Sequence, residues 1–247
     1  MSTQKKRLDL LLVEKNLASS RQRSQALILA GRILVDHEPV DKPGTLIHVH
    51  AEIILKGDDL PFVSRGGLKL DSALSEFNID VKDLICLDVG ASTGGFTDCL
   101  LQRGASKVFA VDVGYGQLAW KIRNDPRVLV LERTNIRHLP DDALPCLVDF
   151  ACIDVSFISL KIVIPATLKF MKKPSRIVAL IKPQFEVGKG KVGKGGIVRD
   201  SELQQKVLEE LPLFFSSQGL FCESIIPSPV LGAKGNKEFL ISLTLAE

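Results

Sequence analysis

The chain has 247 residues, of which 45% are hydrophobic and 25% are charged, and its formal net charge is +3. This composition is typical of a globular protein of one or two domains, and it excludes a disordered or collagen-like chain. No run approaches the roughly 18 apolar residues that cross a bilayer, and the polar start lacks the apolar stretch of a secretory signal. We therefore expect a cytoplasmic protein that does not act at a membrane.

The first 35 residues are strongly basic, with seven basic residues against two acidic ones and a net charge of +5. This clustering favours a polyanionic partner, and a solvated helix face is an equal alternative. The apolar spacing predicts a helix from Leu8 to Leu17, and Ser19 with Gln22 predicts a capped second helix that ends at Gly31. Strands are expected at 32–36 and 46–55, separated by turns at 37–39 and 42–44.

From residue 85 onward, strand patterns alternate with helix patterns. Strands are expected at 85–89, 107–112, 128–132, 148–155 and 177–181, with helices from Gly94, after Gly116 and from Ser159. This order predicts an α/β domain with a parallel, doubly wound sheet. After a helix at 201–215, strands 220–226 and 239–245 are joined by a connection too short for a helical crossover, so the last strand is expected to be antiparallel. We expect domains at 1–58 and 65–247, with a linker at 59–64.

A glycine turn follows the first strand of this domain, with the spacing G-x-x-x-G-G and an acid before it. Asp88 is placed to accept hydrogen bonds from the ammonium group of an amino acid, and Asp112, at the end of the next strand, from ribose hydroxyls. Two carboxylates would repel a pyrophosphate but fit S-adenosylmethionine, with a purely structural turn as the alternative. The cofactor-binding residues predicted here are Asp88, Gly90, Ala91, Ser92, Gly94, Gly95, Phe96 and Asp112.

Four charged residues are expected at the carboxyl edge of the sheet, where ligands of open α/β sheets lie. Asp154 and Lys182 follow parallel strands, and Glu238 starts the antiparallel strand. Lys69 lies in the first turn of a helix that starts near Arg65, where a lysine opposes the helix dipole. Each alone is more often a plain surface residue. Together they form an acid/base site that can activate a poor nucleophile such as a sugar hydroxyl.

Neither the five cysteines nor the four histidines show the spacing of a metal site. The cysteines are odd in number, contain no CxxC pair and mostly lie in apolar runs, where a thiol behaves as a small hydrophobic group. We expect reduced cysteines and no metal. The segment 182–199 carries five bases, one acid and five glycines. It is expected either to close over substrate phosphates, with Lys189 in contact, or to be an ordinary mobile surface loop.

Lys69, Asp154, Lys182 and Glu238 resemble the K-D-K-E tetrad of FtsJ-like RNA 2′-O-methyltransferases. The whole chain resembles the TlyA family of "haemolysin A" proteins, which are ribosomal RNA (cytidine-2′-O)-methyltransferases. The resembling stretches are 63–70, 88–96, 111–117, 132–135, 153–157, 181–186 and 236–238. Members join their domains by a short segment with Arg and Trp, where this chain has Leu60-Pro61-Phe62-Val63.

The resemblance implies an S4-type RNA-binding domain at 1–58 and a Rossmann-like class I methyltransferase domain after it. It implies that Lys182 activates the ribose hydroxyl and that Asn135 lies near the adenosine of S-adenosylmethionine. Phe157 would stack on a flipped nucleotide, with core packing as an equal alternative. The partner implied is ribosomal RNA in assembled subunits, with no obligate protein partner. The basic residues expected to contact RNA are Lys5, Lys6, Arg7, Arg21, Arg23 and Arg32.

Three other functions are alternatives to this one. A methyltransferase for a base or a small molecule would share the cofactor turn but not the tetrad, and the Asn/Asp-Pro-Pro-aromatic motif of base-amine enzymes is missing at 153–157. A non-catalytic RNA-binding protein would bind without turnover. A secreted haemolysin needs an export signal or a membrane-length segment, and ranks last.

Overall fold

The computed structural model describes residues 4–18, 20–56, 60–188, 190–193 and 195–246. The chain divides into two compact units, Met1–Asp59 and Leu60–Glu247. Among the described residues, no helix combines the length and the apolar character needed to span a bilayer. The extent of the segment between the domains, expected at 59–64, stays a prediction.

The first unit has two helices and two small antiparallel sheets around one apolar core. The helices are α1 (Leu8–Glu14) and α2 (Arg21–Leu29). β1 (Lys5–Arg7) pairs with β4 (Leu46–His48), while β2 (Ile33–Val35) lies between β3 (Glu38–Pro39) and β5 (Ile53–Leu55). The core is formed by Leu8, Leu12, Ile28 and Ile33, each fully buried, with neighbours from both helices.

Three details of this unit differ from the sequence-based expectation. The single strand expected at 46–55 is broken by a turn after His48, so its halves β4 and β5 join different sheets. The turn expected at 37–39 is tighter, because Asp36 and His37 take positive φ angles and the next two residues pair as β3. The cap of α2 is Ser20, whose Oγ accepts from the Arg23 amide at 3.1 Å. The expected cap, Ser19, lies outside the described residues.

The second unit is built on a seven-stranded sheet in the order β11-β12-β10-β9-β6-β7-β8. The parallel strands are β6 (Ile85–Val89), β7 (Lys107–Val111), β8 (Val128–Leu131), β9 (Val148–Ile153) and β10 (Met171–Ile181). β12 (Phe239–Leu245) inserts between β10 and β11 (Leu220–Pro227) and runs antiparallel to both. The prediction of a mostly parallel sheet with an antiparallel last strand is confirmed.

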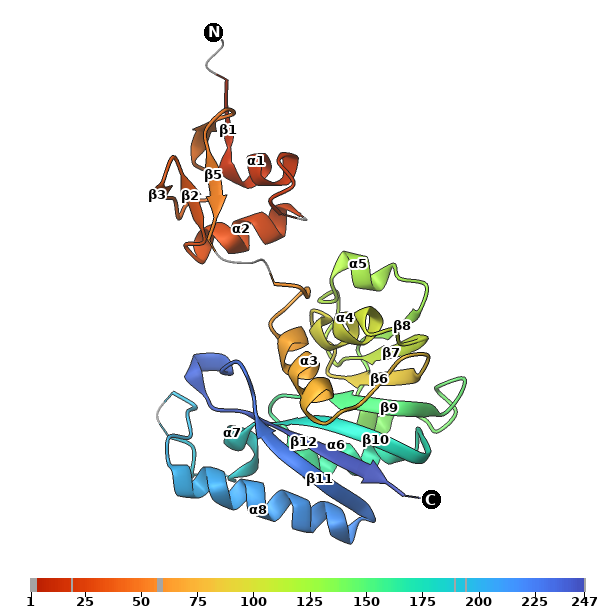
Figure 1. Ribbon diagram of the computed structural model, residues 1–247. Coiled ribbons are helices and arrows are strands. Elements are labelled where there is room, and N and C mark those ends of the chain that lie inside the picture. The colour runs from red at the N-terminus through yellow and green to blue at the C-terminus, as the bar shows by residue number, and fades with distance from the viewer. Residues whose placement is uncertain (1–3, 19, 57–59, 189, 194, 247) are drawn as a thin grey trace. The chain divides into compact units, whose positions relative to one another are not determined.

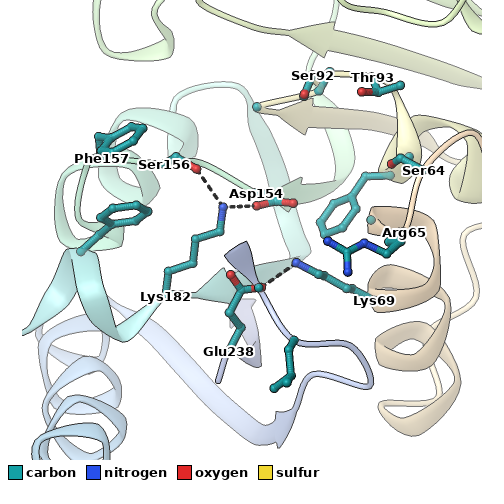
Figure 2. A pocket seen from close by; sticks show the side chains of 18 of the residues that line it. Ser64, Arg65, Lys69, Ser92, Thr93, Asp154, Ser156, Phe157, Lys182 and Glu238 are labelled. Carbon is teal, nitrogen blue, oxygen red and sulfur yellow. Dashed lines mark hydrogen bonds and ion pairs between the residues drawn. The ribbon is translucent and has the colours of Figure 1, made fainter. Parts of the chain in front are cut away.

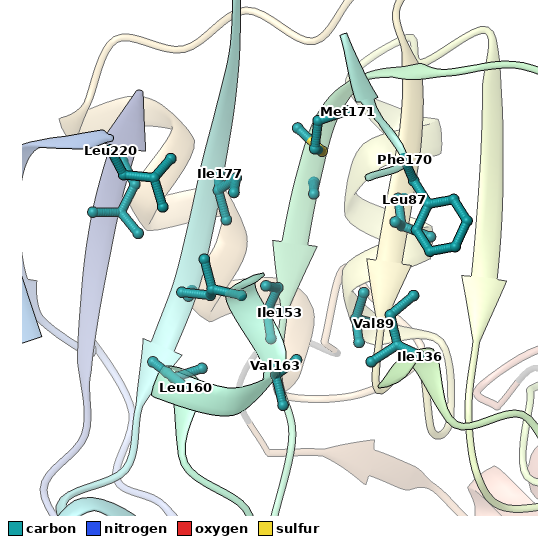
Figure 3. Close-up of a cluster of buried hydrophobic side chains, with 14 of the residues drawn as sticks. Leu87, Val89, Ile136, Ile153, Leu160, Val163, Phe170, Met171, Ile177 and Leu220 are labelled. Carbon is teal, nitrogen blue, oxygen red and sulfur yellow. The ribbon is translucent and has the colours of Figure 1, made fainter. Parts of the chain in front are cut away.

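Helices cover both faces of this sheet because alternate strand side chains point to opposite sides. Leu87, Val89 and Ile153 face α6 (Leu160–Leu168) and α8 (Ser201–Ser217), in the apolar cluster of Figure 3. Cys86 and Cys152 face the other layer, which contains α3 (Gly66–Glu76), α4 (Gly95–Gln102) and the four-residue α5 (Trp120–Arg123) (Figure 1). The helix expected directly after Gly116 therefore starts later and is short.

The described cysteines are all free thiols. Cys86, Cys99 and Cys152 are completely buried, and burial raises the pKa of the Cys99 thiol to about 12. Cys146 differs from the general expectation because it is exposed. The buried thiols therefore act as small apolar groups that fill the layer under α3 and α4.

Candidate active site

Four charged side chains from separate parts of the chain line one cavity of about 480 Å³ (Figure 2). Asp154 follows β9 and Lys182 follows β10 at the carboxyl edge of the parallel strands. β12 runs the opposite way, so Glu238, directly before it, reaches the same edge. Lys69 enters from the first turn of α3, whose Leu70, Ala73 and Leu74 are buried against the sheet layer.

The four side chains form two close ion pairs. Lys69 Nζ lies 2.6 Å from Glu238 Oε2, and these side chains are only 10% and 3% exposed. Lys182 Nζ lies 2.6 Å from Asp154 Oδ1, with exposed fractions of 11% and 23%. Each lysine thus faces its own carboxylate where the side chains are largely shielded from solvent, and charges there interact more strongly than at the surface.

The glycine turn forms the wall of the cavity next to these pairs. Gly90 has a φ of 89°, and a Cβ there would lie 2.3 Å from the backbone oxygen of Asp154. A Cβ on Gly95 would lie 2.2 Å from Ser64 Oγ and 2.9 Å from the Gly67 nitrogen. Glycine is therefore needed at both positions, and it lets α3 and α4 begin side by side at the cavity. The first turn of a helix is where backbone N–H groups lack partners within the helix.

Asp88 lies behind the turn and does not line the cavity. It is completely buried, its Oδ2 accepts from Thr97 Oγ1 at 2.6 Å, and its Oδ1 accepts no hydrogen bond. Burial raises the pKa of Asp88 to about 7. The expected direct contact with an ammonium group therefore has no open path in this structure, although one carboxylate oxygen remains unpaired.

A second, smaller cavity adjoins the first, because Ala91 and Ser92 line both. Asp112 lines it and holds the turn, accepting from the Ser92 amide at 2.7 Å and the Gly114 amide at 2.6 Å. Glu132, at the end of β8, also lines it and accepts from Arg123, which lowers the pKa of the glutamate. A ligand that spans both cavities would thus meet a carboxylate in the smaller one.

Two other predicted cofactor residues do not line either cavity. Asn135 accepts from the Arg137 amide at 3.1 Å and caps the short helix η1 (Ile136–His138). Gly94, with a φ of 94°, is the residue before α4 and lies against Leu118. These two residues therefore shape the loops around the cavities.

Phe157 lies at the rim and is 90% exposed, so the alternative of core packing is wrong. Its φ is 65°, which is uncommon for a bulky residue and marks a constrained loop. Its ring centroid lies 5.0 Å from that of Phe185, at an angle of 46°. The two rings form an apolar platform on the cavity that Lys182 also lines.

The basic residues of the first unit are not all free to contact a ligand. Arg7 and Arg21 both donate to Asp9, which is completely buried, and Gln25 adds a further hydrogen bond at 3.0 Å. These bonds hold the pKa of Asp9 well below its usual range. Lys6 pairs with Glu14 at 2.8 Å and Arg32 donates to the Lys56 carbonyl, whereas Lys5 is exposed. Part of the basic cluster therefore stabilises the fold.

Defined contacts hold both ends of the basic segment 182–199 in its described residues. Its start is the short helix α7 (Pro183–Glu186), and near its end Asn236 accepts from the Val198 amide at 3.1 Å and donates to the Gly196 carbonyl at 3.0 Å. Lys189 lies outside the described residues. The same stretch that carries Glu238 thus also anchors this segment.

Sequence reasoning missed several side chains that line the cavities: Ser64, Arg65, Thr93, Ser156, Gln184, Phe185, Leu231, Gln117 and Glu132. Several of these side chains are neighbours in sequence of predicted site residues, within the stretches that resemble the family. That proximity is the signal that could have identified them. Among the described residues no group of three or more His, Cys, Asp or Glu side chains is arranged to hold a metal ion.

Comparisons with known proteins agree with this geometry. Residues 62–245 match the FtsJ-like methyltransferase family, and residues 6–53 match the S4 domain. The chain is 48% identical to the YqxC protein of Bacillus subtilis, covering 98% of this chain and 87% of that one. It is 46% identical to the 16S/23S rRNA (cytidine-2′-O)-methyltransferase TlyA of Mycobacterium tuberculosis, covering 96% and 89%.

A solved hemolysin-type structure from Streptococcus thermophilus is 44% identical, with a TM-score of 0.77 over 100% of this chain and 90% of that one. The likeness extends over both units. The chain therefore belongs to the TlyA family, in which an S4 domain precedes an FtsJ-like methyltransferase domain.

Proposed function

We propose that this protein transfers a methyl group from S-adenosylmethionine to the ribose 2′-hydroxyl of a cytidine in ribosomal RNA, within assembled subunits. The observation that carries the proposal is the convergence of two lysine–carboxylate pairs beside a glycine turn in one cavity. The TlyA relative named for this reaction supports the choice of ribosomal cytidine.

The described residues fit S-adenosylmethionine. The turn at 90–95 brings backbone close to the cavity, where a Cβ at Gly90 or Gly95 would collide with neighbouring atoms. Asp112 uses one lone pair on each oxygen for Ser92 and Gly114, which leaves acceptor capacity for ribose hydroxyls in the smaller cavity. When bound, the cofactor supplies a methyl group on a positively charged sulfur.

The chain's own residues supply the base and the orientation. Once its ammonium group has released a proton to solvent, Lys182 takes the proton of the attacking 2′-hydroxyl on Nζ, and Asp154 holds this nitrogen at the cavity wall and stabilises the ammonium that forms again. The Lys69–Glu238 pair places a second cation near the site and holds α3 against β12. Phe157 and Phe185 offer a stacking surface for the target nucleotide.

The first unit provides RNA affinity. An S4 domain with a basic start contacts phosphates, and this part of the attraction weakens as salt rises. Lys5 is the exposed member of the cluster whose removal leaves the Asp9 network intact. Lys5→Ala should lower subunit affinity and its salt dependence without changing stability.

The proposal is tested by incubating the full chain with labelled S-adenosylmethionine and isolated ribosomal subunits, then mapping ribose methylation by mass spectrometry. Wild-type protein should form 2′-O-methylcytidine, and Lys182→Ala should form none while still binding subunits. The matched control is Lys172→Ala, which removes a lysine paired with Asp149 at 2.7 Å outside the cavity. Binding without product would support the non-catalytic alternative, and product on a base would contradict the tetrad's role.

A further inference from the structure

Lys182 has a second polar neighbour that the tetrad does not include. Its Nζ donates to Ser156 Oγ at 3.0 Å while it is paired with Asp154 at 2.6 Å. Ser156 lines the cavity and lies on the loop that follows β9 (Figure 2). The ammonium group is therefore held from two sides by one short loop.

The geometry of an amine relates these two contacts to the direction in which the lone pair of Lys182 Nζ points. Nitrogen has four tetrahedral positions, of which Cε occupies one, and a neutral amine has two N–H donors and one lone pair. The hydrogen bond to Ser156 engages one donor and the ion pair with Asp154 holds the nitrogen close to the carboxylate, so together they restrict the directions in which the lone pair can point. With Asp154 alone, the group can rotate about the Cδ–Cε and Cε–Nζ bonds, and the lone pair has several orientations.

Hydrogen bonds and packing contacts hold the backbone of the loop that carries Ser156. The Asp154 amide donates to the Val89 carbonyl at 2.9 Å, and Gly90 packs directly against the Asp154 backbone. Phe157 is held at a positive φ against Phe185.

The far end of the loop is fixed as well. Glu186 of α7 accepts from Ser159 Oγ at 2.6 Å and from the Leu160 amide at 2.8 Å. The segments after β9 and β10 are thus joined by hydrogen bonds and a ring contact on both sides of the lysine. The backbone that carries Ser156 cannot move away from Nζ without breaking these links.

We infer that Ser156 is a positioning residue that aims Lys182 Nζ at the ribose 2′-hydroxyl. This inference rests on the proposed function. In the step that it serves, the hydroxyl proton passes to the Lys182 lone pair, the oxygen forms a bond to the methyl carbon, and the carbon–sulfur bond breaks with its electron pair moving to sulfur. The products are the 2′-O-methyl ribose, a neutral thioether and a protonated lysine, so charge and atoms balance.

The kinetic test compares Ser156→Ala and Ser156→Thr with wild type, and uses Ser217→Ala as the matched control. Ser217 is an exposed serine at the end of α8, whose hydroxyl donates to the Phe214 carbonyl at 2.7 Å and accepts from the Gln218 side-chain amide at 3.4 Å. Ser156→Ala should lower kcat about 10- to 100-fold, the range that misplacement of a catalytic group produces, with KM for both substrates unchanged. Ser156→Thr keeps the hydroxyl on an exposed position and should restore the rate.

A second readout does not need turnover. The acylation rate of Lys182 in the protein alone, measured by mass spectrometry, should rise about two- to tenfold in Ser156→Ala, because Nζ loses one hydrogen bond of ordinary net strength. Lys172 serves as the internal reference. An unchanged acylation rate, an unchanged kcat or a raised KM would overturn the inference. An inactive wild type with the expected acylation change would reject the proposed function and retain the link between Ser156 and Lys182.

Discussion

The buried pair Lys69–Glu238 gives the sharpest prediction about stability. Lys69→Met removes the ammonium group but keeps a side chain of similar length, and leaves Glu238 charged at a position where its side chain is 3% exposed. At 2.6 Å, the attraction is about 6 kcal/mol for an effective dielectric constant of 20, before desolvation is subtracted. Breaking a buried pair by removing one partner costs about 3–5 kcal/mol, so we expect a loss of this size in the free energy of unfolding.

The double variant Lys69→Met with Glu238→Gln measures how much of the lost stability comes from the interaction between the two side chains. It leaves no unpaired buried charge, so its free energy of unfolding should lie well above the value expected from adding the two single losses. The coupling between the two sites should be at least about 2 kcal/mol. The two single variants and the double variant should all be inactive in methylation. A double variant that regains stability without regaining activity would show that catalysis needs both charges, apart from their effect on stability.

Urea unfolding followed by tryptophan fluorescence measures these losses. Trp120 is the single tryptophan of the chain and lies in the same unit as the pair. The control is Lys172→Met, because the side chains of Lys172 and Asp149 are 44% and 25% exposed, and a pair of this kind contributes about 1 kcal/mol or less. If Lys69→Met costs no more than Lys172→Met, or if the double variant shows simple additivity, the argument from burial is refuted.

Three further outcomes follow from single side chains. Burial raises the pKa of Asp88 to about 7, so the folded state holds this proton more tightly than the unfolded state does. The free energy of unfolding, measured with urea, should therefore fall as the pH rises from about 4 to 7. Asp88→Asn should flatten that slope. In Gly232→Ala the added methyl would lie 1.9 Å from Glu238 Oε1, so the unfolding free energy should drop by about 1–3 kcal/mol with a slower methyl transfer, and an unchanged rate would contradict the packing argument. Phe157→Ala should weaken RNA binding by about 1–3 kcal/mol in a filter-binding assay, the contribution of one stacked base, whereas the control Phe221→Ala, an exposed phenylalanine on β11, should leave it unchanged.

Much of the second unit was predictable because its strands are buried on both faces. The apolar runs at 85–89 and 177–181 and the glycine turn after Val89 mark strand ends in the sequence itself, and they place Asp154 and Lys182 at one edge. The glycine turn was visible for the same reason, since its glycines follow a strand. The roles of these residues remain proposals that the experiments above test.

The first unit was harder to predict because its strands are short and their partners decide where they end. Residues 46–55 look like one alternating strand, yet β4 pairs with β1 and β5 with β2, so the chain must turn between them. Asp9 stands in the first turn of a helix, where an acid is ordinary. Only the fold brings Arg21 to it, from 12 residues away, and makes part of the basic cluster structural.

The sequence by itself determined the kinds of groups at the candidate site and the edge of the sheet where they gather, because strand periodicity and glycine spacing are local signals. Its motifs also resemble those of the family to which the chain belongs. Only the tertiary structure decided which lysine faces which carboxylate. Lys69 and Glu238 are 169 residues apart and meet because β12 inserts beside β10, whereas Lys182 turns to Asp154 and Ser156 on the neighbouring strand end. Such pairings depend on strand order and on loops fixed by distant contacts, and no local pattern encodes them.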